Sequence, residues 1–465
     1  MSEVGRTVIR MATAKRSKLM FRCGECGWEA AKWVGRCGEC QVWGSVAEVG
    51  TPTLRVAPGA VTSKAVPIGD VSVESSTSVS SGVAELDRVL GGGLVPGAVI
   101  LLAGEPGVGK STLLLEVAAQ TARMGRRTLY VSGEESASQV RLRADRTGAV
   151  EPELYLAAET DLGAVLTHIE DTQPALLVVD SVQTIGASDS DGVPGGVSQV
   201  KEVAAALVRT AKTHNITTII VGHVTKDGSI AGPRVLEHVV DVVLHFEGSR
   251  ESRLRMVRTL KNRFGTVDEV GCFDLSSDGI VPVTDPSGLF LEARTTPVSG
   301  TCVAVTMEGK RPLVAEVQAL VSMQEAEKPR RATSGLDSSR LALILAVLQR
   351  DRRLRLSSRD VFAATVGGMR LLDPAADLAV AVALASSFSE VAVPTGVVAI
   401  GELGLAGQLR RVRDINVRLD EAARLGFTHA IVPADTNSTV KKRAGLEVKE
   451  AWSLPDVLDI LRLRQ

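Results

Sequence analysis

The stretch "AVILLAGEPGVGKST", residues 98–112, constrains the fold of this chain more than any other. Residues 104–111 fit the pattern G-x-x-x-x-G-K-[ST], after an apolar run and at the start of the helical run "STLLLEVAAQTAR". The glycines let the backbone turn tightly and approach a phosphate closely. A strand, a glycine-rich turn and a helix in this order predict a phosphate-binding loop in an α/β domain.

We expect this loop to bind the phosphates of ATP through its backbone N–H groups and the N-terminus of the helix. Lys110 is expected to reach the β and γ phosphates, and Ser111 is expected to hold Mg²⁺. The predicted nucleotide-binding residues of the loop and first helical turn are Gly104, Glu105, Pro106, Gly107, Val108, Gly109, Lys110, Ser111 and Thr112.

ATP hydrolysis also needs an acidic partner for the metal and a group that polarises water. Asp180 ends the apolar run "ALLVVD" and is predicted to face Mg²⁺, although it could instead cap a helix. Glu134 and Glu135 close "LYVSGEE"; spacing does not decide between them, and we prefer Glu134 as the water-polarising group. His223 ends "TTIIVGH" and could sense the γ phosphate or be a hydrogen-bonded loop histidine.

Short β-rich runs alternate with helical runs between residues 66 and 286. This pattern predicts an ATPase core with a mostly parallel sheet and helices on both faces. A mixed region follows over residues 287–465, for which we predict an α+β domain. Its expected helices lie at about 337–350, 374–388, 414–425 and 453–463.

The segment "CGECGWEAAKWVGRCGEC" has the spacing C-x₂-C-x₁₀-C-x₂-C. Two such knuckles present four thiolates to one tetrahedral ion, so we predict a structural Zn²⁺ site in a small module over residues 1–45, followed by a linker over 46–65. A redox dithiol is the alternative. The predicted ligands are Cys23, Cys26, Cys37 and Cys40.

Two further sets of residues in the chain are ambiguous. The tryptophans of the cysteine module are expected to fill its small core, with stacking on nucleic-acid bases as the alternative: Trp28, Trp33 and Trp43. Cys272 and Cys302 have no partner motif and are expected to be buried free thiols.

Composition limits the possible partners and location. The net charge of −1 means that a nucleic-acid surface must be a local patch. The chain has no run of 18 apolar residues, and its N-terminus lacks an apolar core followed by a cleavage site. We therefore expect a cytoplasmic protein that does not insert into a membrane.

The segment "SGVAELDRVLGGGLVPGAVILLAGEPGVGKST", followed by "YVSGEES", resembles the RecA and KaiC type of ATPase core. With the upstream cysteines and "KNRFG", the chain from residue 23 to about 460 resembles the bacterial RadA (Sms) family of DNA repair and recombination proteins. The resemblance implies a hexameric ring that acts on single-stranded and branched DNA. It also implies a DNA-dependent ATPase that promotes branch migration with the RecA recombinase.

The "KNRFG" segment, residues 261–265, follows the alternating stretch "SRLRMVRT", which is typical of a strand, so its cations should lie at a sheet end. The resemblance implies that Lys261 and Arg263 reach the γ phosphate of the neighbouring subunit, as an arginine finger does. An ordinary basic turn, closed by Gly265 and anchored by Phe264, is the alternative.

Residues from about 290 onward resemble the proteolytic domain of Lon proteases. Ala375 stands where that family has its serine nucleophile, and Asn416 stands at the position of its lysine, so we expect no peptidase activity. The domain instead carries arginine clusters, which the resemblance favours as a DNA-binding and oligomer-forming platform and which could otherwise be a solvated face. The clusters are Arg350, Arg352, Arg353, Arg355 and Arg359, and Arg410, Arg411 and Arg413.

Long glycine-rich loops follow the strands that end at Asp180 and His223. In RecA-like proteins the corresponding loops line a central channel and contact DNA, so the resemblance assigns Lys201, Lys226 and Arg234 to DNA contact. Two other functions stay open: a KaiC-like regulatory ATPase without DNA, and, less favoured, an ATP-dependent Lon-like peptidase.

Overall fold

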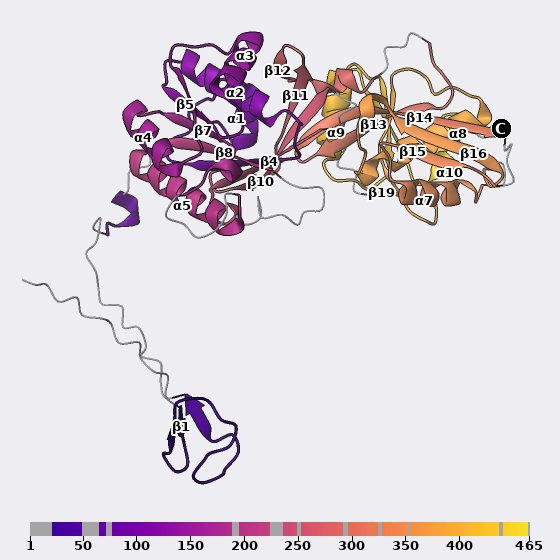
Figure 1. The fold of residues 1–465 in the computed structure, drawn as a ribbon. Helices are drawn as coiled ribbons and strands as arrows, with labels where there is room; N and C mark the ends of the chain where they lie inside the picture. Colours follow the sequence, from indigo (N-terminus) through magenta and orange to yellow (C-terminus); the bar gives the residue numbers. More distant parts are fainter. Residues whose placement is uncertain are drawn as a thin grey trace, which may run out of the picture. The chain divides into compact units, whose positions relative to one another are not determined.

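The computed structural model describes ten segments of the chain and divides it into two compact units, residues 1–72 and 73–465 (Figure 1). The described residues are 21–48, 65–70, 77–187, 195–223, 236–248, 253–291, 296–323, 328–351, 354–436 and 440–463. The predicted domain boundaries at residues 45, 65 and 286 stay predictions.

The smaller unit contains a short antiparallel sheet built around the four cysteines. β1 (Phe21–Cys23) lies between β2 (Glu29–Ala30) and β3 (Val46–Glu48). A 3-10 turn, η1 (Ile68–Asp70), also belongs to this unit. Among its described residues the buried hydrophobic core consists of Cys23, Cys37 and Val46. Such a core is too small to stabilise a fold by apolar burial alone.

The cysteine sulfurs fit a tetrahedral metal ion. All four Sγ atoms lie within 4.8 Å of one another. Cys23 and Cys40 are 3.7 Å apart at their Sγ atoms, and Cys26 and Cys37 are 3.5 Å apart. A zinc ion with Zn–S bonds of about 2.3 Å holds its sulfurs about 3.8 Å apart in tetrahedral geometry. The four thiolates would therefore hold Zn²⁺, and metal binding would supply the stability that the small apolar core cannot.

The tryptophans of this unit divide into two groups. Trp28 packs against the core, and a Cβ on Gly38 would come within 2.7 Å of its ring. Trp33 and Trp43 are 64% and 74% exposed, and both rings lie against Gly35. The core-filling interpretation is therefore right for Trp28 and wrong for the other two.

In the larger unit, nine strands among the described residues form one sheet in the order β12-β11-β10-β9-β4-β8-β7-β5-β6 (Figure 1). The six strands from β9 to β6 in this order are parallel to one another. β10 is antiparallel to β9, β11 to β10, and β12 to β11. The strands are β4 (Val99–Gly104), β5 (Thr128–Ser132), β6 (Leu154–Ala158), β7 (Leu176–Asp180), β8 (Thr217–His223), β9 (Val242–Glu247), β10 (Leu254–Asn262), β11 (Val270–Ser276) and β12 (Gly279–Pro282).

Helices cover both faces of this sheet because successive strand residues point to opposite sides. On β4, Ile100 and Leu102 face the core formed with α1 (Ala84–Leu90), α2 (Lys110–Arg123) and α3 (Ala137–Thr147). Leu101 faces the core formed with α4 (Leu162–Thr172) and α5 (Val197–His214). The predicted fold class of the ATPase core is confirmed.

The C-terminal part contains a second, mixed sheet, in the order β15-β16-β14-β13-β17-β20-β21 among the described residues. Helices α7, α8 and α10 share one core with it, and α9 packs on the other face. Its strands are β13 (Thr301–Glu308), β14 (Arg311–Met323), β15 (Arg331–Ser334), β16 (Arg359–Thr365), β17 (Val397–Ala399), β20 (His429–Pro433) and β21 (Glu447–Ala451), with a separate pair β18 (Glu402–Leu403) and β19 (Leu409–Arg410). Its helices are α7 (Ser338–Leu348), α8 (Asp377–Ser389), α9 (Ile415–Arg424) and α10 (Leu454–Ile460). The predicted α+β class is confirmed.

A buried ion pair joins the two sheets. Glu85 on α1 is 1% exposed and pairs with Arg311, which begins β14 and is 7% exposed. Glu85 also accepts a hydrogen bond of 2.9 Å from the N–H of Cys272, and Arg311 donates to the carbonyl of Thr284 at 2.7 Å. Each charge is thus removed from water but has partners, as buried charges require.

The hydrophobic core continues across the same junction. Leu254, Val270 and Cys272 of the nine-stranded sheet belong to the cluster that fills the C-terminal part. Cys272 and Cys302 are both buried free thiols, as expected, and burial raises the pKa of Cys272 to about 11. The two sheets of this unit are therefore held together by apolar packing as well as by charge.

We predict that Cys37→Ser removes zinc from the protein and disorders residues 21–48, because the apolar core among these residues is too small to hold the fold without the metal. Zinc content measured on the purified protein should be one ion per chain for the wild type. Cys302→Ala is the matched control, since its thiol is buried elsewhere, and it should keep one zinc. An unchanged zinc content in Cys37→Ser would contradict the assignment.

We predict that Arg311→Met lowers the free energy of unfolding by about 3 kcal/mol, because the buried Glu85 then keeps only its longer ion pair of 3.5 Å with the half-exposed Arg88. Urea denaturation measures the effect. The neighbouring Lys310 forms a half-exposed ion pair with Asp268 at 3.2 Å, so Lys310→Met should cost only about 0 to 1 kcal/mol. Equal costs for the two variants would show that the junction does not depend on this pair.

Candidate functional site

The phosphate-binding loop, Glu134, Asp180 and His223 come together at the carboxyl edge of the parallel strands, whereas Lys261 and Arg263 do not. Gly104 at the end of β4 is level with His223 at the end of β8. Ser132, two residues before Glu134, is level with Asp180 at the end of β7. Ligand sites in open α/β sheets form at this edge, because the strand ends and the N-termini of the following helices meet there.

The phosphate-binding loop connects β4 to α2 with a backbone that requires glycine at several positions. Gly107 and Gly109 have φ angles of +81° and +106°, and a Cβ on Gly104 would lie 2.3 Å from the carbonyl oxygen of Phe246. No side chain caps the N-terminus of α2. Its first N–H groups therefore face the loop, where they can bind an anion.

Lys110 is the first residue of α2, and its side chain folds back into the loop. Only 4% of the residue is exposed, and Nζ donates to the carbonyls of Gly104 and Glu105, both at 2.9 Å. Burial lowers the pKa of Lys110, and the negative charges of Asp180 and Glu134 act in the opposite direction. The ammonium group thus lies in a cradle between the loop and two carboxylates.

The remaining residues of the predicted loop differ in their exposure. Glu105, Pro106 and Gly107 are exposed, Val108 is buried, and Gly109, Ser111 and Thr112 are intermediate. Exposure of the middle of the loop leaves its backbone accessible to a ligand.

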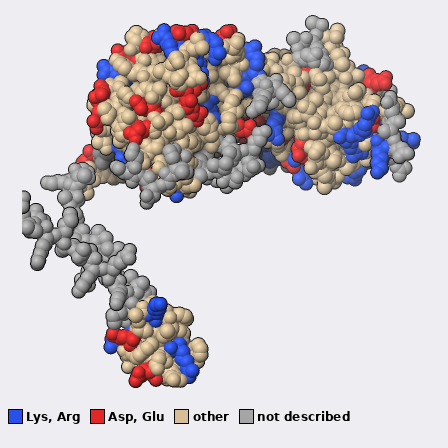
Figure 2. All heavy atoms as spheres, viewed as in Figure 1, with Lys and Arg blue, Asp and Glu red and all other residues tan. Residues whose placement is uncertain are grey.

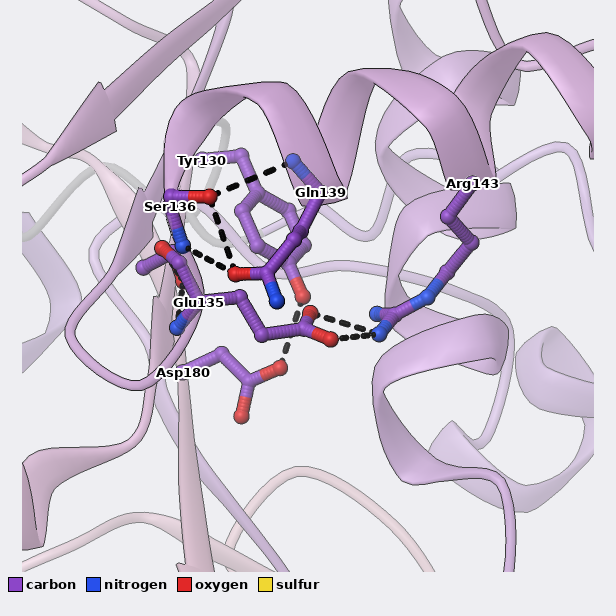
Figure 3. Close-up of polar contacts among 7 residues, drawn as sticks. Tyr130, Glu135, Ser136, Gln139, Arg143 and Asp180 are labelled. Atoms are coloured by element: carbon purple, nitrogen blue, oxygen red, sulfur yellow. Dashed lines mark hydrogen bonds and ion pairs between the residues drawn. The ribbon is translucent and has the colours of Figure 1, made fainter.

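Asp180 lies at the end of β7 and is 6% exposed. Its Oδ2 accepts a hydrogen bond of 2.7 Å from the hydroxyl of Tyr130 on β5 (Figure 3). The short 3-10 helix that follows, η3 (Val182–Thr184), has Ser181 at its N-cap and receives no side-chain cap. The alternative role of Asp180 as a helix cap is therefore not seen.

Glu134 and Glu135 have different surroundings. The Glu134 carboxylate accepts a hydrogen bond of 2.6 Å from Ser181 Oγ and lies 2.9 Å from His223 Nε2. Burial raises the pKa of Glu134, but the bonds from Ser181 and His223 outweigh it and lower the pKa below its usual value. Glu135 instead forms an ion pair with Arg143 on α3 (Figure 3).

His223 ends β8, and its side chain is 29% exposed. Nε2 contacts Glu134, whereas Nδ1 is buried without a hydrogen-bond partner among the described residues. The histidine therefore links the end of β8 to the turn after β5 that carries Glu134, and it directly precedes residues 224–235, which lie outside the described residues.

The "KNRFG" segment lies at the other edge of the sheet. β10 runs antiparallel to β9, which runs parallel to β4, so β10 ends where β4 begins. Its last residue, Asn262, is level with Val242, which is level with Ile100. Ile100 precedes Gly104 by about 13 Å along the strand, at about 3.3 Å per residue. The segment therefore points away from the phosphate-binding loop of its own chain.

Both cations of this segment have partners within the chain. Lys261 Nζ donates to the carbonyls of Glu237 and Val240, at 2.6 and 2.8 Å. Arg263 pairs with Asp241 at 2.9 Å, and Lys212 on α5 pairs with the same carboxylate at 3.0 Å. The turn is thus well anchored, by charge more than by Phe264, which is 44% exposed.

The predicted DNA contacts are only partly described. Lys201 is exposed on α5, whereas Lys226 and Arg234 lie outside the described residues. Arg352 and Arg353 of the first arginine cluster also lie outside them. In the second cluster Arg410 and Arg411 pair with acidic side chains, at 3.4 and 3.1 Å.

Charge is distributed unevenly over the face shown in Figure 2. Acidic and basic side chains are interspersed over the part with the nine-stranded sheet, while basic side chains gather over β15 and β16. Lys328, Arg330 and Arg331 are exposed there. None of the helices in the described part of the chain combines the length and apolar character needed to cross a membrane.

Ala375 and Asn416, which the resemblance to Lon proteases placed at the catalytic dyad, both lie among structural contacts. Ala375 is fully buried, and its N–H donates to Asp373 at 3.0 Å. Asp373 in turn pairs with the buried Arg418 at 2.7 Å. The carboxamide of Asn416 accepts a hydrogen bond of 3.0 Å from the N–H of Lys441. These positions are occupied by structural contacts.

Sequence reasoning missed three residues that contact the site. Tyr130 binds Asp180, Ser181 binds Glu134, and Arg255 on β10 donates to the carbonyl of Val108 at 2.8 Å. Ser181 directly follows Asp180 and could have been found from that position. Tyr130 and Arg255 carry no such signal, because each lies inside an ordinary strand pattern.

Comparisons with known families match three parts of the chain. Residues 21–48 match the rubredoxin metal binding domain, residues 76–229 the AAA domain, and residues 369–436 the ChlI subunit of Mg-chelatase. The AAA match covers the phosphate-binding loop together with Glu134, Asp180 and His223. These matches support a zinc-binding module and an ATPase domain.

The chain is also similar over most of its length to curated proteins named DNA repair protein RadA. It is 58% identical to the protein of Mycobacterium tuberculosis over 90% of this chain and 88% of the relative. Identity to the Mycolicibacterium smegmatis protein is 56%, over 95% and 96% of the two chains. Identity to the Streptococcus pyogenes serotype M1 protein is 47%, over 96% and 99%. The resemblance drawn from the sequence is confirmed, and the chain belongs to the RadA family of DNA repair proteins.

Proposed function

We propose that this chain is a ring-forming, DNA-dependent ATPase motor of recombinational DNA repair. It would promote branch migration of recombination intermediates in the cytoplasm, together with the RecA recombinase. Membership of a DNA repair family with an ATPase domain supports the general activity. The observation that carries the motor proposal is the position of the "KNRFG" segment at the sheet edge opposite its own phosphate-binding loop.

The chemistry of hydrolysis would take place at the carboxyl edge. The loop N–H groups and Lys110 would bind the phosphates of ATP, and the buried ammonium would neutralise charge on the β and γ phosphates. Ser111 and Asp180 offer oxygen ligands of the kind that Mg²⁺ prefers, next to the loop, and would hold that ion. When bound, Mg²⁺ supplies positive charge to the phosphate oxygens.

Glu134 is the better candidate to polarise the attacking water. The low pKa of Glu134, set by Ser181 and His223 against the effect of burial, keeps its carboxylate ionised as a hydrogen-bond acceptor. Glu135 is engaged by Arg143 and points its carboxylate to that partner (Figure 3). His223 contacts Glu134 and directly precedes the segment after β8. A ligand bound to that segment would therefore act on the proposed catalytic carboxylate through His223.

Lys261 and Arg263 would act on the nucleotide of a neighbouring subunit. Since they lie at the sheet edge away from their own loop, only a second copy of the chain can place its loop against them, which favours a closed ring. Six subunits are the number that the family resemblance implies. An arginine supplied in this way stabilises the charge of the transition state.

Single-stranded and branched DNA would be held mainly through their phosphates. The loops after β7 and β8, with Lys201, Lys226 and Arg234, would line the channel of the ring. The exposed basic residues near β15 and β16 would add contacts that neutralise phosphates without reading bases. His223 directly precedes one of these segments and contacts Glu134. DNA binding to that segment would therefore change the position of Glu134 through the hydrogen bond between the two side chains.

We expect Glu134→Gln to lower the ATP hydrolysis rate by about 10²- to 10⁴-fold while ATP binding persists, because the amide cannot accept a proton. Glu135→Gln should have a much smaller effect, since that carboxylate pairs with Arg143 and not with the water-polarising cluster. Steady-state hydrolysis and fluorescent-nucleotide binding separate the two quantities. The reverse order of effects would assign the base to Glu135.

The motor is tested by ATP hydrolysis with and without single-stranded DNA, coupled to unwinding of a forked duplex. We expect DNA to stimulate the wild type, Lys110→Ala to lose ATP binding, and Arg263→Ala to bind ATP but lose hydrolysis. Lys212→Ala is the matched control, because it removes the other cation on Asp241 without touching the "KNRFG" segment. It should retain DNA-stimulated hydrolysis.

Mixing Arg263→Ala and Lys110→Ala subunits should restore part of the activity, since some interfaces then combine an intact loop with an intact arginine. Absence of rescue at every ratio would contradict action across an interface. Hydrolysis that ignores DNA, with no unwinding, would favour a regulatory ATPase. Degradation of casein by the purified protein would support the alternative hypothesis of an ATP-dependent peptidase.

A further inference from the structure

The Tyr130 hydroxyl is a buried polar group that the proposed chemistry does not yet use. Tyr130 lies in the middle of β5 and is 1% exposed, within the core formed by α1, α2 and α3. Its hydroxyl donates to Asp180 Oδ2 at 2.7 Å (Figure 3). A phenol is protonated at neutral pH and a carboxylate only accepts, so the hydroxyl is the donor in this contact.

Packing alone does not require a hydroxyl at this position. The same core contains Phe246 and Phe273, which are fully buried without any polar atom. A phenol oxygen placed in such a core is unfavourable unless it finds a hydrogen-bond partner. The choice of tyrosine over phenylalanine at residue 130 is therefore explained by the contact with Asp180.

The surroundings leave Asp180 as the acceptor for this phenol. Glu135 also lies near Tyr130, but its carboxylate is bound by Arg143, with one contact of 2.5 Å (Figure 3). On Asp180, Oδ2 is used by the tyrosine, and the described residues offer no hydrogen bond to Oδ1. A hydrogen bond to one oxygen restricts rotation of the carboxylate about its terminal bond, and this favours one direction for the second oxygen.

We propose that Tyr130 is a positioning residue that fixes the Asp180 carboxylate so that Oδ1 is presented to the Mg²⁺ of Mg·ATP. This inference rests on the proposed role of Asp180 and extends it to a residue outside the loop and the acidic positions. Hydrogen bonds from outer residues commonly orient metal-binding carboxylates in this way, and their loss weakens metal binding by about 10- to 100-fold.

Tyr130→Phe tests the proposal, because it keeps the ring and removes only the hydroxyl. The chain contains two tyrosines, so Tyr155→Phe is a matched control for the same chemical change. Tyr155 lies on the neighbouring β6, is 42% exposed and stacks under Arg127. Both changes are made in Glu134→Gln protein, which should bind ATP without consuming it.

The measurement is binding of fluorescent ATP over a range of Mg²⁺ concentrations and in EDTA. We expect Tyr130→Phe to raise the Mg²⁺ concentration needed for half-maximal tightening by about 10- to 100-fold. Affinity in EDTA should not change, and Tyr155→Phe should change neither quantity. An unaltered Mg²⁺ dependence in Tyr130→Phe would overturn the proposal, and an equal loss in EDTA would overturn it in favour of a packing role.

A spectroscopic readout keeps the proposal testable if Tyr130→Phe does not fold. In Tyr155→Phe protein, Tyr130 is the remaining tyrosine, and ultraviolet resonance Raman bands then report its hydrogen bond alone. Adding Mg·ATP should shift these bands, whereas ATP with EDTA should not. Absence of any Mg²⁺-dependent shift would overturn the proposal.

Asp180→Asn separates this inference from the function on which it rests. If Asp180→Asn binds Mg·ATP as the wild type does, the proposed metal role of Asp180 is wrong. If Asp180→Asn loses Mg²⁺-dependent binding while Tyr130→Phe keeps it, only the role of Tyr130 is wrong. In the double variant, the effect of Tyr130→Phe should disappear, because the two residues then no longer act through one carboxylate.

Discussion

Parallel pairing of β4, β5, β7 and β8 is the constraint on which the rest of the structure depends. Because parallel strands all end at the same edge, residues far apart in the chain meet there, although no short sequence motif connects them. The phosphate-binding loop and Glu134 follow β4 and β5, and Asp180 and His223 end β7 and β8. The register sets Gly104 level with His223 and Ser132 level with Asp180. A single edge thus gathers the basic, acidic and backbone groups that phosphate chemistry needs.

The antiparallel strand β10 breaks that pattern and brings charged residues to the opposite edge of the sheet. Near its start, Arg255 donates to the carbonyl of Val108 in the phosphate-binding loop. Its end carries Lys261 and Arg263 to the opposite side, where Asp241 anchors the arginine. One strand therefore contacts the nucleotide loop of its own subunit and displays the two cations proposed to reach the next.

Much of this arrangement could be predicted from the sequence, since its signals are local. The spacing of the cysteines, the glycine-rich loop and the alternation of strands and helices each lie within short stretches, and backbone geometry translates them directly into structure. The tryptophans were harder, because exposure depends on how a small module closes around its metal: Trp28 is packed and Trp33 is not.

Contacts between distant residues could not be read in the same way. Tyr130 and Asp180 are 50 positions apart, and Glu85 and Arg311 are 226 positions apart. In sequence, Tyr130 is one more apolar residue of a buried strand, and Arg311 is one more charge after a turn. Only the packing of whole sheets shows which polar atom each one meets.

The shared core at the junction has a practical consequence for dissecting this chain. A fragment that ends at residue 291, with the ATPase sheet alone, would turn Leu254, Val270 and Cys272 out into water. It would also lack Arg311, whose guanidinium forms the buried ion pair with the Glu85 carboxylate. We therefore expect the ATPase core, expressed without the second half of the chain, to be less soluble and less stable than it is in the whole chain.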